Sequence, residues 1–173
     1  YIDLYLLHFP VSFRYKGDDE KWPTPEDCLD KDYLSVWHEL EKLVEMGLVK
    51  HIGVSNFNAQ QIQRVVDSSK IKPFCNEIEF HPAFARDELV KLCESLNITV
   101  LGYCPLGRPK EGKKSFLNDE KVVEIATKYS KTSAQVSLRF AIQCGVIPIP
   151  KSSSKSRIDE NYNIFDFHLS DED

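Results

Sequence analysis

Long apolar runs, an excess of positive charge and paired cysteines are all missing from this sequence. No stretch approaches the roughly 18 apolar residues that a membrane span needs. Lys and Arg number 22 against 27 Asp and Glu, a net charge of −5, which argues against nucleic acid or an anionic membrane as a partner, because both favour a basic surface. Five scattered cysteines form no CxxC pair, so we expect no disulfides and a reducing, cytosolic setting.

Methionine is also scarce, with Met46 as its single occurrence. The chain opens on Tyr1, where a strand pattern is already running, and we therefore expect it to be a fragment of a longer protein. What is present is an ordinary globular composition, 42 % hydrophobic and 28 % charged, which argues against disorder. We expect one incomplete domain over residues 1–173.

Short apolar runs alternate with helical patterns along the chain. Strands are expected at 2–8, 49–54, 73–80, 98–103 and 146–149, helices at 33–46, 59–69, 86–96, 119–129, 133–144 and 156–162, and loops at 11–31 and 104–118. This alternation predicts parallel strands with right-handed crossovers. An open doubly wound sheet and part of an eight-stranded barrel both fit, although no GxGxxG or GxxxxGK[ST] motif supports the open sheet.

Polar residues stand near or just past the carboxyl end of every expected strand. They are His8, Ser55 with Asn56, Glu77 with Glu79 and His81, Tyr103 with Cys104, and Lys151 with Ser152. In both candidate architectures, function gathers at the carboxyl ends of parallel strands. These residues are therefore the candidates for a functional site.

Five segments in a fixed order resemble the aldo-keto reductase family, and the match covers nearly the whole chain. They are YIDLYLLHFP at 1–10, GLVKHIGVSNF at 47–57, NEIEFHP at 76–82, GYCPLG at 102–107, and IPKS at 149–152 followed by Arg157, Glu160 and Asn161. The resemblance implies an α/β fold, a (β/α)8 TIM barrel of which this chain supplies strands four to eight. It also implies reduction of aldehydes and ketones to alcohols by hydride transfer from NADPH.

The resemblance also implies what this chain lacks. The Asp, the Tyr general acid and the Lys of the family's catalytic tetrad belong to the first three strands, and only His8 of the four has a counterpart here. We therefore expect the isolated chain to be inactive and poorly soluble, and the full-length parent to be a monomer. Two alternatives stay open: a non-catalytic nucleotide-binding relative with a structural or regulatory role, and a truncated product without function.

The resemblance gives roles to the residues at the first strand ends. His8 would orient the substrate carbonyl by donating a hydrogen bond where negative charge develops, and Phe9 would form a wall of the substrate pocket. Ser55 and Asn56 would hold the nicotinamide carboxamide, and Tyr103 would stack on the nicotinamide ring. The plainer alternatives are a histidine that closes a strand, polar residues that start a turn, and buried aromatic side chains.

Two residues depart from the family pattern. Glu77 stands where the family usually has Gln, and a carboxylate would favour the positively charged oxidised nicotinamide, so we expect weaker discrimination against NADP⁺. Cys104 stands where Ser is frequent, and nothing marks it as a reactive thiol.

The resemblance also assigns Leu106 and Arg108 to the cofactor. They belong to a loop that includes Lys110, Lys113 and Lys114 and would cover the pyrophosphate.

Lys151, Ser152 and Arg157 give the clearest cofactor argument. Their ammonium, hydroxyl and guanidinium groups suit a phosphate monoester, and they lead into a helix N-terminus, which favours anions. Together they resemble a site for the 2′-phosphate of NADP, and Glu160 and Asn161 would face the adenine.

The remaining patterns concern metals and substrate. No histidines or cysteines have metal-ligand spacing, and we predict no structural metal. Phe13, Tyr15 and Trp22 in the 11–31 segment hint at a lipophilic carbonyl substrate.

Overall fold

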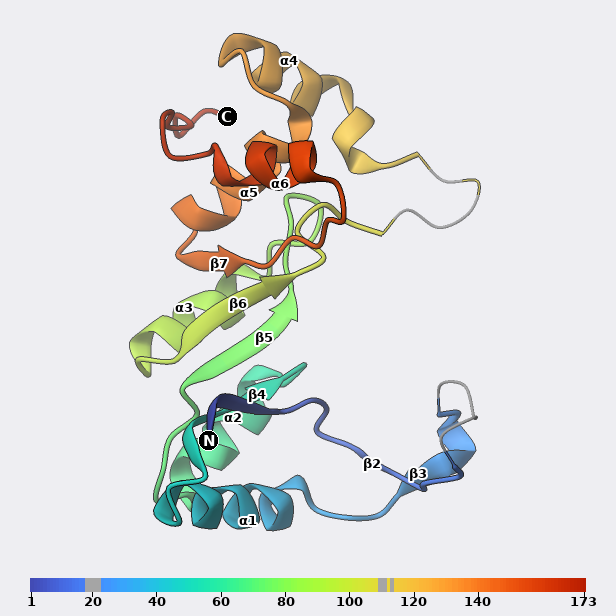
Figure 1. Cartoon of the computed structure of the whole chain (residues 1–173), viewed down its shortest axis with the longest axis vertical. Coiled ribbons are helices and arrows are strands. Elements are labelled where there is room, and N and C mark those ends of the chain that lie inside the picture. Colours follow the sequence, from blue (N-terminus) through green and yellow to red (C-terminus); the bar gives the residue numbers. More distant parts are fainter. Residues whose placement is uncertain (18–22, 109–111, 113) are drawn as a thin grey trace. The chain divides into compact units, whose positions relative to one another are not determined.

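The structure is a computed structural model that describes residues 1–17, 23–108, 112 and 114–173 (Figure 1). It divides into two compact units, Tyr1–Asn76 and Glu77–Asp173. The division falls within the strand β5 (Cys75–Glu79). Trp22, Lys110 and Lys113 lie outside the described residues.

The first unit is built on two parallel strands. β1 (Ile2–Leu7) pairs with β4 (Val49–Ser55) in a register that runs from Ile2 opposite Val49 to Leu7 opposite Val54. The helices are α1 (Tyr33–Glu45) and α2 (Ala59–Ser68). The core side chains are buried apolar residues of these elements and of the turn between β4 and α2, namely Trp37, Leu40, Ile52, Val54, Phe57, Ile62 and Val65. β4 is buried from Ile52 to Ser55, and a parallel strand covered on both faces needs apolar side chains on both, which explains the run from Ile52 to Val54.

The expectation of an irregular loop over 11–31 was wrong in part. β2 (Ser12–Phe13) pairs antiparallel with β3 (Cys28–Leu29), and a short 3-10 helix, η1 (Pro25–Asp27), precedes β3. The buried Asp27 carboxylate holds this ribbon together, because it accepts hydrogen bonds from the backbone nitrogen and hydroxyl of Thr24 and pairs with Lys16. The sequence gives no alternating pattern here, because the strands are only two residues long.

The second unit continues the parallel pattern. β5 neighbours β6 (Thr99–Tyr103), and β6 pairs in parallel with β7 (Val146–Pro148). The helices are α3 (Asp87–Ser95), α4 (Glu120–Lys128), α5 (Ser133–Gln143) and α6 (Lys155–Tyr162), with the 3-10 helix η2 (Phe116–Asn118) before α4. The ring of Phe80 stacks on that of Phe140 in α5 at 5.8 Å.

The helix and strand patterns in the sequence are confirmed to within two residues at each end. Their boundaries have local causes. Asn58 caps α2 as expected, since its side chain accepts from the backbone nitrogen of Gln61. Gly47 follows α1 with a φ of +71°, the left-handed geometry that commonly ends a helix.

Candidate functional site

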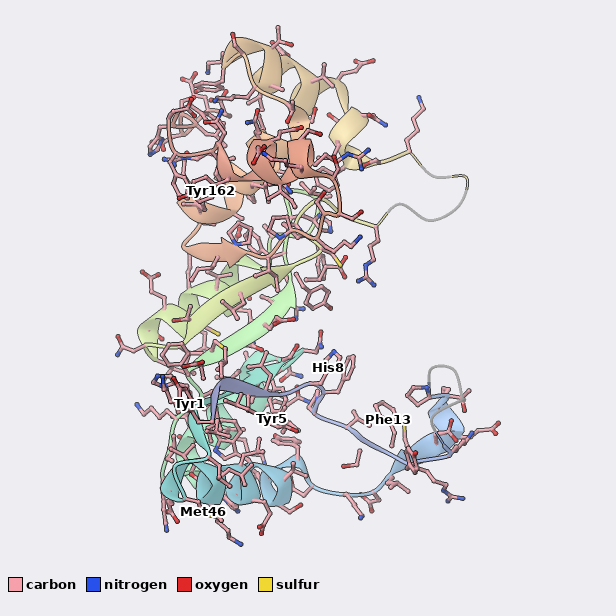
Figure 2. All side chains as sticks on the ribbon, in the orientation of Figure 1. Tyr1, Tyr5, His8, Phe13, Met46 and Tyr162 are labelled. Carbon is pink, nitrogen blue, oxygen red and sulfur yellow. The ribbon has the colours of Figure 1, made fainter. Side chains whose placement is uncertain are left out.

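In the first unit, the carboxyl ends of β1 and β4 lie side by side. Leu7 and Val54 are partners in the register, so His8 and Ser55 follow at the same edge. Figure 2 shows His8 directly beyond the end of β1. The Asn56 side-chain nitrogen Nδ2 donates to the His8 backbone oxygen over 3.0 Å and to the Ser55 hydroxyl oxygen over 3.1 Å. The structure therefore brings these three predicted residues together.

The His8 ring is exposed and supported by aromatic neighbours. It stacks on Phe9 with ring centroids 4.5 Å apart, and Phe9 makes an edge contact with Phe13 at 6.4 Å. Phe9 and Phe13 are both more than a third exposed. An exposed imidazole beside accessible aromatic rings can donate a hydrogen bond to a polar group of a ligand whose remainder is apolar.

The Asn56 backbone has an uncommon geometry. Its φ is +64°, in the left-handed region that only short polar residues and glycine adopt readily. The chain turns there between buried Ser55 and buried Phe57, and α2 begins after Asn58. A Ser hydroxyl and an Asn side-chain oxygen at such a turn supply the donor and the acceptor types that an amide group requires.

In the second unit, partly buried polar residues stand on β5 and at the end of β6. Glu77 and Glu79 occupy alternate positions of β5, and Tyr103 is the last residue of β6. Burial and the negative charge of Glu79 raise the pKa of Tyr103. The Tyr103 phenol therefore stays neutral across the physiological range, which suits a ring that stacks on a ligand.

A tight turn follows Tyr103. Cys104 has a φ of +48°, and the Gly107 nitrogen donates to the Cys104 oxygen over 2.8 Å. The Ser137 hydroxyl of α5 donates to the buried Pro105 oxygen over 2.6 Å. Leu106 is half-buried in this turn and Arg108 is exposed beyond it.

Two further residues support this turn, and one of them, Phe116, was not singled out from the sequence. The ring of Phe116 lies against Gly107, where a Cβ would come within 2.7 Å of it. The buried ring of His81 stacks on Phe116 at 4.9 Å, and its Nε2 lies 3.4 Å from a Glu79 carboxylate oxygen. His81 is among the strand-end candidates of the sequence, but its contact with this turn was not predicted. Phe116 has no sequence signal for this role, because Gly107 and His81 are brought to it only by the fold.

The segment from β7 into α6 carries exposed basic groups. Lys151 and Arg157 are exposed, and neither forms an ion pair with another described residue. Ser152 is partly buried, and its hydroxyl oxygen accepts from the Ser154 backbone nitrogen over 3.2 Å just before α6 begins. Two cations near the start of a helix form an environment that attracts an anion.

Glu160 has a partner within the protein. The Thr132 hydroxyl, which caps α5, donates to a Glu160 carboxylate oxygen over 2.6 Å. The buried Gln135 side-chain nitrogen donates to the backbone oxygens of Glu160 and Asn163. In this structure the Glu160 carboxylate therefore ties α6 to α5, and its predicted contact with adenine stays untested.

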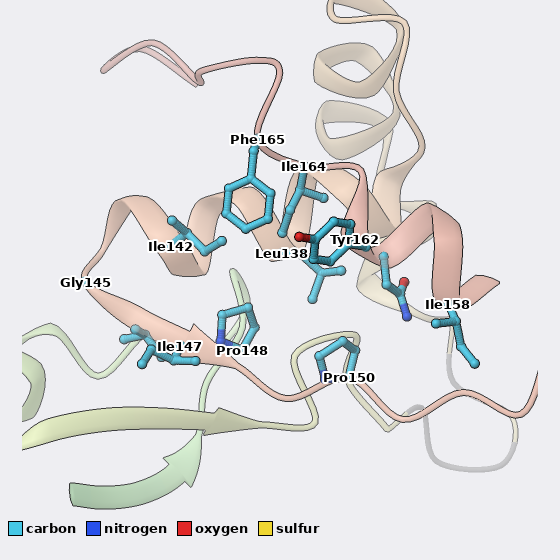
Figure 3. Close-up of a pocket in the computed structure, with 12 residues that line it drawn as sticks. Leu138, Ile142, Gly145, Ile147, Pro148, Pro150, Ile158, Tyr162, Ile164 and Phe165 are labelled. Carbon is cyan, nitrogen blue, oxygen red and sulfur yellow. The ribbon is translucent and has the colours of Figure 1, made fainter. Parts of the chain in front are cut away.

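An apolar pocket of about 600 Å³ lies beside α6 (Figure 3). It is lined by α5, β7, α6 and the segment after α6, with Asn161 as its one amide side chain. Ile147, Ile158 and Phe165 are more than half exposed. The predicted residue Asn161 therefore faces an apolar environment together with Tyr162.

The comparisons with known proteins cover the whole chain. Residues 1–173 match the Aldo/keto reductase family. The chain is 46 % identical to "Aldo-keto reductase family 1 member A1-A" of Danio rerio over 181 residues, which is 100 % of this chain and 56 % of that protein. It is 43 % identical to "Aldose reductase B" of Dictyostelium discoideum, again over 100 % of this chain and 57 % of that protein. This chain belongs to the aldo/keto reductase family.

Solved structures of aldo-keto reductases share the fold. The crystal structure of a Bombyx mori aldo-keto reductase in complex with NADP aligns with a TM-score of 0.86 at 40 % identity, over 99 % of this chain and 55 % of that one. The aldose reductase of Schistosoma japonicum aligns with a TM-score of 0.87 at 41 % identity, over 99 % and 56 %. The fold is thus the parallel α/β fold of part of a TIM barrel. The chain spans about half the length of the relatives it matches.

Metal-binding clusters and membrane-spanning helices are absent from the described residues. No group of three or more His, Cys, Asp or Glu side chains is placed to hold a metal ion. No helix in the described ranges is long and apolar enough to cross a membrane.

Proposed function

We propose that this aldo/keto reductase chain supplies most of the NADPH-binding surface of an enzyme that reduces aldehydes and ketones to alcohols. The observation that carries the proposal is the order of the polar residues along the chain. Each parallel strand ends near a polar group that can contact part of NADPH. A relative of 40 % identity was solved in complex with NADP. A small carbonyl compound is the proposed substrate, and the cytosol the proposed location.

The cofactor role is divided along the chain. Ser55, Asn56 and Glu77 contact the nicotinamide carboxamide in this proposal, and Tyr103 covers the ring. The next contacts, toward the pyrophosphate of the cofactor, come from Cys104, Leu106 and Arg108. Lys151, Ser152 and Arg157 bind the 2′-phosphate, whose two negative charges match two exposed cations. Glu160 and Asn161 complete the adenosine end.

His8 is the proposed catalytic residue of this chain. Its imidazole donates a hydrogen bond to the substrate oxygen, where negative charge develops as NADPH, when bound, delivers hydride to the carbonyl carbon. Phe9 supplies an apolar contact to the substrate. The other members of the family's tetrad have no counterpart among residues 1–173, so we expect no aldehyde reduction by this chain alone.

Binding of NADPH to the 173-residue chain tests the cofactor proposal. We expect saturable binding, followed by quenching of Trp fluorescence, and about tenfold weaker binding for Lys151→Ala or Arg157→Ala, as for loss of one charge-assisted hydrogen bond. Lys155→Ala is the matched control, because Lys155 is paired with Asp159 over 2.8 Å. Equal losses in all three variants would show that general charge, and not a phosphate site, governs binding.

The reductase proposal has a second test. A chimera joins the upstream portion of the Danio rerio relative to this chain and is assayed for NADPH oxidation with an aldehyde. We expect activity that falls at least about a hundredfold on His8→Ala, the usual range for loss of an oxyanion donor. A folded, NADPH-binding chimera without activity would favour the non-catalytic nucleotide-binding alternative.

A further inference from the structure

Asn76 is a fully buried amide with one hydrogen bond. Its Nδ2 donates to the backbone oxygen of Phe57 over 3.0 Å, while its Oδ1 has no partner among the described residues. A buried acceptor left without a partner destabilises a protein by about 1–3 kcal/mol. Stability alone would favour an apolar residue here, so the presence of an amide points to a use for the single hydrogen bond that it donates.

The Phe57 oxygen that receives this bond belongs to the turn between β4 and α2. The first helical hydrogen bond of α2 runs from Ile62 nitrogen to Asn58 oxygen. The Phe57 oxygen thus lies outside the helix, and Asn76 is its donor. Other contacts fix different parts of the turn: the Phe57 ring meets Tyr33 edge-on at 5.1 Å, and Asn58 is held by its capping box with Gln61.

The orientation of this turn determines where the Asn56 side chain lies. Asn56 is left-handed, and from that geometry its Nδ2 reaches the His8 oxygen and the Ser55 hydroxyl. Strained backbone conformations persist only when their surroundings fix them, and they gather at functional sites. Rotation of the peptide group between Phe57 and Asn58 would release this geometry without removing any core side chain.

We propose that Asn76 is a positioning residue, which holds the turn of residues 55–57 in the geometry that receives the nicotinamide end of NADPH. This inference rests on the proposed function, because Ser55 and Asn56 are assigned to the nicotinamide there. Asn76 itself touches neither cofactor nor substrate in the proposal. It acts through the carbonyl of Phe57.

Two substitutions separate positioning from stability. Asn76→Leu replaces the amide by an apolar group of similar size, and Asn76→Ala removes the amide and leaves a cavity, so both variants lack the donor. We expect Asn76→Ala to be the less stable variant, because it leaves a buried cavity. Dissociation constants of the full chain are measured by calorimetry for NADPH and for adenosine 2′,5′-bisphosphate, which carries the 2′-phosphate but no nicotinamide.

Loss of positioning should appear with one ligand only. We expect both variants to bind NADPH about three- to tenfold more weakly, the range of one hydrogen bond. Both should bind adenosine 2′,5′-bisphosphate as the unmodified chain does. The inference fails if the affinity for NADPH is unchanged or if the affinities for both ligands fall equally. It also fails if the loss of NADPH affinity is larger in the less stable of the two variants.

Gln135→Leu is the matched control in the second unit. Gln135 is also a buried amide that donates to backbone oxygens, here those of Glu160 and Asn163 at the end of α6. Because α6 carries Arg157, this variant should weaken the binding of both ligands by the same factor. If Gln135→Leu weakened only the binding of NADPH, the two ligands would not distinguish the nicotinamide end of the site from the 2′-phosphate end. That result would count against the inference.

A ligand-free measurement separates this inference from the proposed function. If the unmodified chain binds neither ligand, the cofactor proposal for this chain fails. Amide hydrogen exchange then decides the inference: the backbone amides of residues 56–58 should exchange faster in both variants, while those of α2 stay protected. Unchanged exchange at residues 56–58 would overturn it.

Discussion

At the scale of single residues, two left-handed positions shape the strand ends. Asn56 follows β4 with a φ of +64°, and Cys104 follows β6 with a φ of +48°. Each bends the chain sharply just past the carboxyl end of a strand. The same conformation is thus used in both units, once with a residue that tolerates it and once with cysteine, which is uncommon there.

The charge of Glu77 should affect the balance between the two redox forms of the cofactor. A carboxylate attracts the positive ring of NADP⁺, so Glu77→Gln should raise the ratio of the NADP⁺ to the NADPH dissociation constant. We expect about a two- to fivefold change, the size of one solvent-screened charge interaction. Both constants are measured by calorimetry, with Glu94→Gln on the exposed face of α3 as the control. An unchanged ratio would contradict the hypothesis.

Gly107 should tolerate no side chain. Its φ is +71°, and a Cβ would lie 2.7 Å from the Phe116 ring. Gly145 has a φ of +75° but nothing within 4 Å, so Gly145→Ala isolates the conformational penalty of about 1–2 kcal/mol. Gly107→Ala should lower the free energy of unfolding by a further 1–3 kcal/mol or so from overpacking. Urea denaturation measures both, and equal losses would show that Phe116 moves aside.

At the scale of elements, short polar interactions join pieces that lack a core of their own. The β2–β3 ribbon depends on the Asp27 carboxylate, and α6 is tied to α5 through Thr132 and Gln135. Such elements are the first to loosen when one partner changes its charge, because few apolar contacts hold them.

The β2–β3 ribbon should therefore loosen in acid. Hydrogen bonds from Lys16 and Thr24 lower the pKa of Asp27 to about 2. A lowered pKa means that the stabilisation is complete above the ordinary carboxyl value of 3.8 and is lost as the pH falls through about 2. The protection of the Phe13 and Cys28 amides against hydrogen exchange, relative to the rate of an unfolded peptide at the same pH, should fall across that interval. Asp27→Asn should remove this dependence, and a pH response that persists in it would assign the effect to another group.

At the scale of the whole molecule, large apolar side chains remain exposed. Ile147 and Phe165 beside the pocket are 52 % and 64 % exposed. Contiguous apolar surface of this kind drives association or is covered by further protein. Members of the family matched here are nearly twice as long as this chain.

The isolated chain should associate with itself in solution. We expect its weight-average mass in sedimentation equilibrium to rise with concentration, and the double variant Ile147→Lys with Phe165→Lys to shift it toward the monomer. Met46→Lys is the control, because Met46 is 68 % exposed but lies outside the pocket. Identical behaviour of all three proteins would show that this apolar surface does not drive association.

The sequence by itself determined the elements and the family. Apolar periodicity placed the helices and strands, because one helix face or both strand faces must be buried. The motifs around His8, Asn56, Tyr103 and Lys151 identified the aldo/keto reductase family, because each depends on a few adjacent residues. The polar groups at strand ends were visible for the same reason.

The tertiary structure alone decided which side chains meet. Asn76 is 19 residues from the carbonyl that it holds, and the Thr132 hydroxyl is 28 residues from the Glu160 carboxylate. Neither pairing leaves a periodic trace in the sequence. The ribbon of β2 and β3 escaped prediction because one buried carboxylate, and not an apolar pattern, organises it. Local patterns come from burial, whereas such polar contacts depend on how distant segments pack together.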